Sequence, residues 1–115
     1  MEYYWSLLQG VFYFITGLWP IISIKTFEKV TGPKIDKWLV KTVGVLIAVV
    51  GLALIIAFIR KEISFEMVIV AAGCALGLML IDIIYSLTGV ISKIYLLDAA
   101  AEFVLIIGWV FFNFI

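Results

Sequence analysis

Three carboxylic acids lie within long apolar stretches of the sequence: Asp82, Asp98 and Glu102. A charged side chain at the centre of a transmembrane helix opposes insertion by about 2.5–3.5 kcal/mol, so such residues face the interior of a helix bundle and usually have a partner. Intramembrane acids commonly carry protons or act as counter-ions to ligands. These three residues are therefore the first candidates for a functional site, and a structural role is the alternative for each of them.

The stretch 93–114 carries its polar residues on one side of the expected helix. At about 100° per residue they fall within about 60° of one another. A rise of about 1.5 Å per residue from Ser92 puts Asp98 about 9 Å into the membrane and Glu102 about 15 Å, near the bilayer midplane. Glu102 is the first choice for a functional residue, whereas Asp98 can also be an acid favoured by the dipole at the start of the helix. The residues on this side are Tyr95, Asp98, Glu102, Trp109 and Asn113.

Similar polar stripes follow the other apolar stretches. The first stretch carries Gln9 and Tyr13, and the third carries Asp82 and Ser86. On the second, Lys41 is the deepest of three aligned lysines. We expect the stripes to face one another, with Lys41 as the counter-charge nearest to the acids. Three carboxyl groups against one lysine leave excess negative charge in a low-dielectric interior, which favours the protonated form of at least one. The alternative is that these polar groups only fix the register of the helices, at roughly 0.6–2 kcal/mol each.

Composition explains why these stretches should be membrane helices. The chain is 66% hydrophobic with a mean hydropathy of +1.28, whereas soluble domains are about half apolar. A soluble fold of this size could not bury so much apolar surface. A helix needs roughly 20 apolar residues to cross the hydrocarbon. We therefore predict an all-α fold, an integral membrane bundle of four transmembrane helices at about 5–24, 33–59, 65–88 and 93–114, in a single domain spanning 1–115.

Proline, glycine and serine mark the expected ends of these helices. Pro20 should kink the first helix or end its regular part, and an amphipathic turn can continue beyond it to residue 30. Gly32 suits a left-handed helix end, and Pro33 suits the first position of the second helix. Ser64 and Ser92 are expected to cap the third and fourth helices.

The distribution of charge predicts the orientation. Five of the eight basic residues lie between Lys25 and Lys41. The first and third connections carry six lysines and the second carries two basic residues, so the positive-inside rule places loops 25–37 and 89–92 in the cytoplasm and both termini outside. The chain is thus predicted to be a multi-pass protein of the cell inner (plasma) membrane. Gly73 and Gly77 form a GxxxG pattern in the third helix, for which packing within the monomer is favoured over a dimer interface.

The sequence excludes several kinds of site. It contains no histidine, which rules out haem ligation by histidine, histidine-based zinc sites and serine–histidine or cysteine–histidine triads. The single cysteine, Cys74, cannot form an internal disulfide. We expect no metal, no cofactor and no nucleic-acid partner, and the lipid bilayer is the expected surrounding.

Three segments resemble a group of uncharacterised small bacterial membrane proteins with four helices. These segments are 16–20 (TGLWP), 27–34 (FEKVTGPK) and 38–44 (WLVKTVG). The resemblance covers the first helix through the start of the second, and the region of Asp82, Asp98 and Glu102 has a similar place. In architecture alone the four-helix plan is loosely similar to the DoxX-like families. Both resemblances imply a four-helix membrane fold, and neither implies an activity or a role for any residue.

The leading functional hypothesis is a polar pocket inside the bundle that binds or handles a small amphipathic molecule. Aromatic rings beside carboxylates would suit a cationic or hydroxylated lipophile. The alternatives are a proton-coupled small-molecule transporter, which would require a homo-oligomer, and a non-catalytic accessory or assembly subunit of a membrane complex. An enzyme that uses Glu102 and Asp82 as acid and base ranks lowest. The candidate ligand-binding or proton-carrying residues are Glu102, Asp98, Asp82, Lys41, Tyr13, Trp19, Tyr95, Trp109 and Gln9.

Overall fold

The described part of the chain is built from helices. The computed structural model describes residues 2–114, and within them it contains five helices and no strand. The helices are α1 Glu2–Ile22, α2 Ile24–Thr31, α3 Lys37–Arg60, α4 Phe65–Leu87 and α5 Tyr95–Phe114. Four of them, α1, α3, α4 and α5, are long and apolar enough to cross a membrane. The predicted all-α fold with four candidate membrane spans is confirmed.

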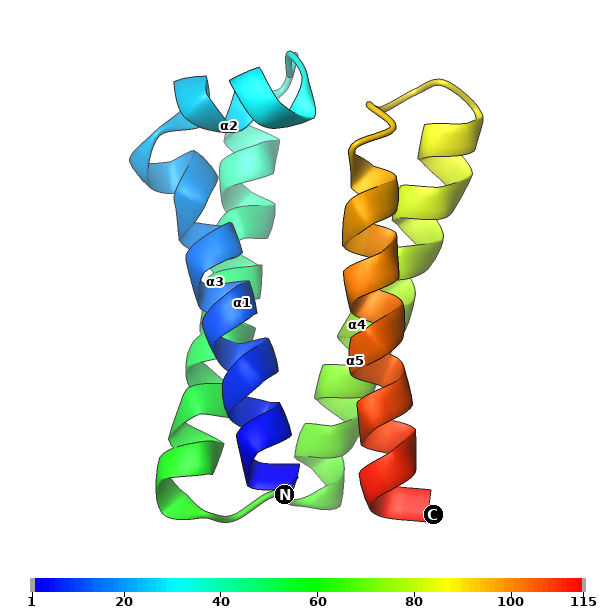
Figure 1. The fold of residues 1–115 in the computed structure, drawn as a ribbon. Helices are drawn as coiled ribbons and strands as arrows, with labels where there is room; N and C mark the ends of the chain where they lie inside the picture. Colours follow the sequence, from blue (N-terminus) through cyan, green and yellow to red (C-terminus); the bar gives the residue numbers. More distant parts are fainter. Residues whose placement is uncertain (1, 115) are drawn as a thin grey trace.

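The four long helices run antiparallel in sequence order and form two closely packed pairs (Figure 1). Helix α1 packs mainly against α3 and α4 mainly against α5, while α1 also contacts α5. Both ends of the described chain lie at one end of the bundle, and α2 and the α4–α5 connection lie at the other. The longest axis measures 39 Å, enough to cover a hydrocarbon core of about 30 Å. We call the end with α2 the lysine-rich end, because six lysines lie there: Lys25, Lys29, Lys34, Lys37, Lys41 and Lys93.

Glycines let the backbones of α1 and α3 lie in direct contact. A methyl group on Gly17 would lie 2.5 Å from the carbonyl oxygen of Gly44, and one on Gly51 would lie 2.5 Å from the amide nitrogen of Phe14. Such distances are too short for carbon, so a side chain at either position would force the helices apart. Gly44, Ala48 and Gly51 are all buried, so these small residues form a packing face of α3 within the chain.

The second small-residue pattern has a different outcome. Gly73 and Gly77 of α4 are exposed, and a methyl group on either would meet no atom of the described residues within 4 Å. The predicted packing of this GxxxG pattern inside the monomer is therefore wrong. The reason is the rotation of α4, which buries the face with Ala71 and Ala75. Two residues of a helix span about 200°, so the two glycines lie on the opposite side.

Serine side chains cap two of the helices. The Oγ atom of Ser64 accepts a hydrogen bond from the amide of Met67 at 3.2 Å, which confirms the predicted cap of α4. Helix α1 continues through Pro20, and Ser23 then caps α2 by accepting from the amide of Thr26 at 3.4 Å. The amphipathic turn expected beyond α1 is thus a separate helix.

Helix α3 begins at Lys37, so the predicted start at Pro33 is wrong. The carboxylate of Glu28 holds the intervening segment against α2. It accepts a hydrogen bond from the amide of Lys34 at 2.9 Å and pairs with the Nζ atom of Lys37 at 3.2 Å. Gly32 turns the chain with a positive φ of 97°. These contacts tie the segment between α2 and α3 to α2 as a turn, and α3 begins after it.

The α4–α5 connection is a tight turn. Gly89 adopts a positive φ of 81°, and the Oγ atom of Ser92 accepts a hydrogen bond from the amide of Ile94 at 3.3 Å. Helix α5 begins at Tyr95, two residues after the predicted start at Lys93. Ser92 therefore caps this turn rather than the first residue of the helix.

Candidate functional site

Glu102 lies in the centre of the bundle and not toward lipid. Its side chain is buried, and its Oε2 atom accepts a hydrogen bond from the hydroxyl of Tyr13 at 2.6 Å. Tyr13 is also buried, so this short bond joins the middle of α1 to the middle of α5. The polar stripes of these two helices therefore face each other, as the sequence predicted.

The side-chain amide of Gln9 joins three helices one turn further toward the chain termini. Its Nε2 atom donates to the carbonyl of Ala71 in α4 at 2.9 Å. Its Oε1 atom accepts from the indole nitrogen of Trp109 in α5 at 2.6 Å. Gln9 and Trp109 are both buried, so these bonds are shielded from competing water.

A serine that the sequence analysis did not select completes this arrangement. The hydroxyl of Ser6 is buried and donates to the carbonyl of Leu54 in α3 at 2.8 Å. The helical spacing indicates this position, because Ser6 lies three residues before Gln9 and seven residues before Tyr13, on the same face of the helix. We call Ser6, Gln9, Tyr13, Glu102 and Trp109 the polar core.

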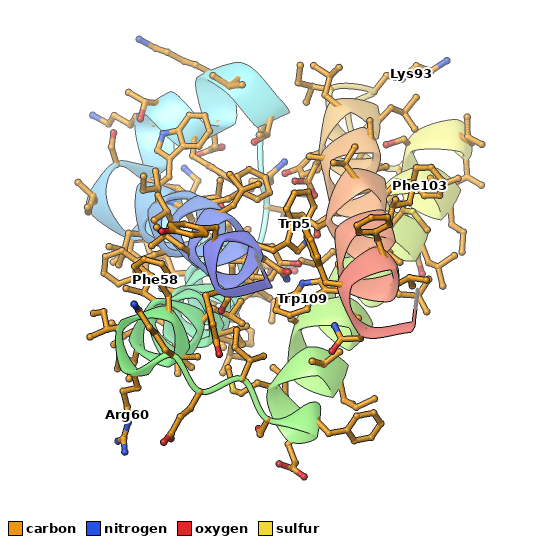
Figure 2. The ribbon with its side chains drawn as sticks, turned by 60° about the horizontal axis from the view of Figure 1, so that its bottom comes forward. Trp5, Phe58, Arg60, Lys93, Phe103 and Trp109 are labelled. Atoms are coloured by element: carbon orange, nitrogen blue, oxygen red, sulfur yellow. The ribbon has the colours of Figure 1, made fainter. Side chains whose placement is uncertain are left out.

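Two tryptophans close the polar core at the end of the bundle that holds both termini. The indole nitrogen of Trp5 donates to the carbonyl of Leu105 at 2.9 Å. Figure 2 shows Trp5 and Trp109 in the middle of the bundle, whereas Arg60 and Phe103 lie on its outside. Asn113 does not join them, because it is exposed and donates to the carbonyl of Trp109 in its own helix.

The other two acids lie toward the lysine-rich end. Asp82 is buried, and the carboxyl group of Asp98 lies within hydrogen-bonding reach of it, with the charge of Glu102 also acting on it. Asp98 is half-buried. The Oδ2 atom of Asp82 is buried and has no hydrogen-bond partner among residues 2–114. The structure therefore brings the three predicted acids into one region, and leaves one of them incompletely bonded.

The expected counter-charge does not join the acids. Lys41 is exposed, and neither of the ion pairs within the described residues includes it. Lys41 lies near the start of α3, three residues before Gly44, where α3 packs against Pro20 of α1. Its side chain lies on the surface at the lysine-rich end. The expectation of Lys41 as an interior counter-charge is corrected accordingly.

Two of the predicted aromatic residues lie at the lysine-rich end rather than in the polar core. The indole nitrogen of Trp19 donates to the hydroxyl of Thr26 at 3.0 Å, which ties α1 to α2. The ring of Tyr95 lies 4.9 Å from the Nζ atom of Lys34, a cation–π contact that ties the start of α5 to the loop before α3. Trp19 and Tyr95 therefore close this end of the bundle.

An electrostatic contact fixes α2 to the loop that follows it. The backbone N–H of Lys34, which donates to the carboxylate of Glu28, lowers the pKa of that carboxyl group below its ordinary value. Partial desolvation acts in the opposite direction, and the ammonium groups of Lys37 and Lys34 lower the pKa further. Glu28 therefore stays ionised down to a lower pH than an ordinary glutamate does.

An apolar groove lies between α3 and α4. Since each of these helices packs mainly against another partner, the space between them stays open to the outside of the bundle. The groove has a volume of about 280 Å³, just below the range of about 300–1,000 Å³ typical of ligand pockets. Its lining is Tyr13, Val43, Leu46, Ile47, Val50, Cys74, Gly77 and Leu78. The groove thus connects the lipid-facing surface to Tyr13, and through its hydroxyl to Glu102.

A second groove lacks this connection. It has a volume of about 220 Å³, lies between α1 and α3, and is lined by apolar residues alone. No residue of the polar core contributes to it. The groove between α3 and α4 is therefore the better candidate for an entrance.

The side chains of the site can form hydrogen bonds, carry charge and transfer protons. Among residues 2–114 there is no group of three or more cysteine, aspartate or glutamate side chains arranged to hold a metal ion. A comparison with known protein families, curated proteins and solved structures finds no match for this chain. The geometry of the polar core and the groove is thus the basis for assigning a function.

Proposed function

We propose that the protein binds a small amphipathic molecule that enters sideways from the bilayer between α3 and α4. The observation that carries this proposal is the position of Tyr13. Its ring lines the apolar groove, and its hydroxyl group bonds to the buried carboxyl group of Glu102. The apolar part of the ligand would occupy the groove, and its polar part would reach this pair.

The chemistry of Tyr13 indicates what the polar part should contain. The hydroxyl group gives its hydrogen to Glu102, which leaves the lone pairs of its oxygen as acceptors. A ligand with a hydroxyl or amine group could donate to that oxygen. Because the groove is lined by apolar atoms, the ring of Tyr13 must move slightly for the two groups to meet. Tyr13 would then act as the gate between lipid and the polar core.

Gly77 allows a direct test of the groove. A methyl group there meets no described atom within 4 Å, so Gly77→Leu fills the groove without disturbing the helix packing. Gly73→Leu is the matched control, because Gly73 lies one turn away on α4, has the same open surroundings and does not line the groove. Native mass spectrometry of protein released from mild detergent would detect the bound molecule.

The expected result is a bound small molecule in the wild type and in Gly73→Leu, and its loss in Gly77→Leu. Retention of the molecule by Gly77→Leu would contradict the proposal. Loss in both variants would also contradict it, since the GxxxG surface rather than the groove would then be the binding element. Circular dichroism in the same detergent confirms that each variant keeps its helices.

A second candidate is proton-coupled transport by an oligomer of this chain. The observation that favours it is the exposed pair Gly73 and Gly77, an unused close-packing surface on α4 that could receive another copy. Asp82 and Glu102 would then carry protons between the lysine-rich end and mid-membrane. Flux driven by a pH gradient in proteoliposomes, abolished by Glu102→Gln, would place transport above simple binding.

We also propose that the lysine-rich end faces the cytoplasm, with the protein in the plasma membrane of a bacterium. Six lysines at that end, against Arg60 and Lys61 at the other, support this orientation. In a Cys74→Ser background, Ser92→Cys should resist a membrane-impermeant maleimide added to whole cells. Ser64→Cys, at the opposite end, should react, and the reverse pattern would refute the orientation.

A further inference from the structure

The side chain of Asp82 has an unfilled bonding position in the interior of the bundle. The residue is only 5% exposed, and its Oδ2 atom is the one buried side-chain oxygen or nitrogen among residues 2–114 without a partner. Buried polar groups in native proteins are nearly always hydrogen-bonded, and an exception points to an absent ligand, ion or water. The neighbouring polar core has no such vacancy, because each of its members has a hydrogen bond.

The same region also lacks positive charge. Asp98 lies beside Asp82, and Glu102 acts on it as well, so three carboxyl groups share one low-dielectric space. The six lysines at this end are engaged or exposed: Lys34 contacts Thr31 and Tyr95, Lys37 pairs with Glu28, and the others lie on the surface, namely Lys25, Lys29, Lys41 and Lys93. Asp82 therefore lacks a compensating positive charge, and the only side-chain hydrogen bond open to it is a proton shared with Asp98.

We infer that the head group of the ligand is a protonated amine and that, after passing Tyr13 and Glu102, it is bound by Asp82. This inference rests on the proposed function and specifies its ligand class, a small lipophilic amine. An ammonium group supplies an N–H donor and a positive charge together, and charge-assisted bonds of this kind are among the strongest in proteins. A metal ion fits less well, since Ca²⁺ and Mg²⁺ require about six or more oxygen ligands and the described residues contain no suitable cluster.

The distance between Asp82 and the groove suits such a molecule. Leu78 lines the groove, and Asp82 follows it by four residues on the same face of α4. Four residues correspond to a rise of about 6 Å, the length of a few methylene groups. A ligand with its alkyl chain beside Leu78 would thus bring its ammonium group to Asp82, with Asp98 as a second carboxylate.

Two probes of the same length separate charge from hydrogen bonding. Octylammonium carries a positive charge and N–H donors, whereas 1-octanol is neutral and donates one O–H. Binding of each would be measured by native mass spectrometry over a concentration series, with the full-length protein in lipid nanodiscs. The variants are Asp82→Asn, which removes the charge but keeps an acceptor oxygen, Asp98→Asn, and the groove variant Gly77→Leu.

The wild type should bind both probes and prefer octylammonium. Asp82→Asn should bind octylammonium roughly 30-fold or more weakly and bind 1-octanol unchanged, which also shows that the variant is folded. Asp98→Asn should also weaken the binding of octylammonium. If Asp82→Asn fails to fold, the result for Asp98→Asn tests the amine assignment in its place. Wild-type affinity for octylammonium in both acid variants, or an equal loss of both probes, overturns the amine assignment.

Gly77→Leu distinguishes this failure from a failure of the proposed function. It should lose both probes, because it fills the space for the alkyl chain whatever the head group is. If Gly77→Leu no longer binds either probe while Asp82→Asn binds octylammonium as the wild type does, the groove is supported as the binding site and the amine assignment is refuted. If Gly77→Leu binds both probes as the wild type does, the groove itself is refuted.

Discussion

Removing the hydroxyl group of Tyr13 isolates the bond at the centre of the polar core. In Tyr13→Phe the ring keeps its place in the groove, and only the donor to the Oε2 atom of Glu102 is lost. Glu102 is 1% exposed, so water cannot easily replace that donor. The variant should therefore fold, but with a lower free energy of unfolding.

The size of the loss follows from the geometry of this bond. Hydrogen bonds between membrane helices are worth about 0.6 kcal/mol on average and about 1.7 kcal/mol at most. The bond from Tyr13 is short, at 2.6 Å, and its acceptor is a buried carboxyl group. Leaving such an acceptor unpaired costs about 1–3 kcal/mol. We expect Tyr13→Phe to lower the free energy of unfolding by about 1.5–2 kcal/mol, a factor of roughly 10–30 in the unfolding equilibrium.

A double-mutant cycle measures this contribution. The free energy of unfolding would be determined in mixed micelles by titration with a denaturing detergent, for the wild type, Tyr13→Phe, Glu102→Leu and the double variant. Tyr4→Phe is the control, because Tyr4 lies on α1, is exposed and packs against Phe58. It should change stability by no more than about 0.5 kcal/mol. A coupling energy between Tyr13 and Glu102 below about 0.5 kcal/mol would refute the reasoning, since the carboxyl group would then have another partner.

Three further predictions concern packing, pH and access. Gly17→Ala should lower the free energy of unfolding by about 1–3 kcal/mol, because its methyl group would collide with the backbone of α3, whereas Gly77→Ala in open space should not destabilise; equal losses in a detergent titration would contradict this. The pKa of Glu28 is lowered on folding, so the stability that its bond to Lys34 contributes is present above the ordinary carboxyl pKa and is lost as the pH falls through the lowered value. NMR titration should give a midpoint below that of an ordinary glutamate, and the protection of the Lys34 amide from hydrogen exchange should fall below that midpoint; a similar step in Glu28→Gln would contradict this. Cys74 lines the groove and is half-buried, so a lipid-soluble maleimide should modify it faster than a charged one, and Gly77→Leu should slow that reaction; equal rates would argue against an opening toward lipid.

The membrane spans were predictable because their signal is local and large. An apolar stretch of about 20 residues has few alternatives to a membrane helix, and the four predicted segments correspond to α1, α3, α4 and α5. The start of α3 was not predictable in the same way. Pro33 fits the first turn of a helix by local rules, but the chain from Gly32 onward turns back to the carboxylate of Glu28, and the helix begins at Lys37. The rules for helix starts do not include such a contact from the preceding helix.

The site was predictable to the extent that polar residues repeat with the helical period. The facing of Gln9, Tyr13 and Glu102 follows from the cost of exposing them to lipid, and their hydrogen bonds bear this out. The same reasoning failed for Lys41, because a helix stripe shows which side is polar but not which of its residues lie in the interior. It failed for Gly77 because small residues fit both a helix interface and an open surface.

A purely structural role accounts for the polar core but not for Asp82, and stability measurements can separate the two. A polar group that only fixes the register of the helices stabilises the fold, as each hydrogen-bonded group in the polar core should. Asp82, with an unpartnered oxygen and a second carboxyl group beside it, should instead lower the stability. Asp82→Leu removes both the unpaired group and the repulsion, so it should raise the free energy of unfolding by about 1–3 kcal/mol. Glu102→Leu, which breaks the bond from Tyr13, should lower it. If Asp82→Leu destabilises the protein as much as Glu102→Leu does, Asp82 is part of the scaffold; a gain in stability with a loss of ligand binding would show that the chain retains this acid for function.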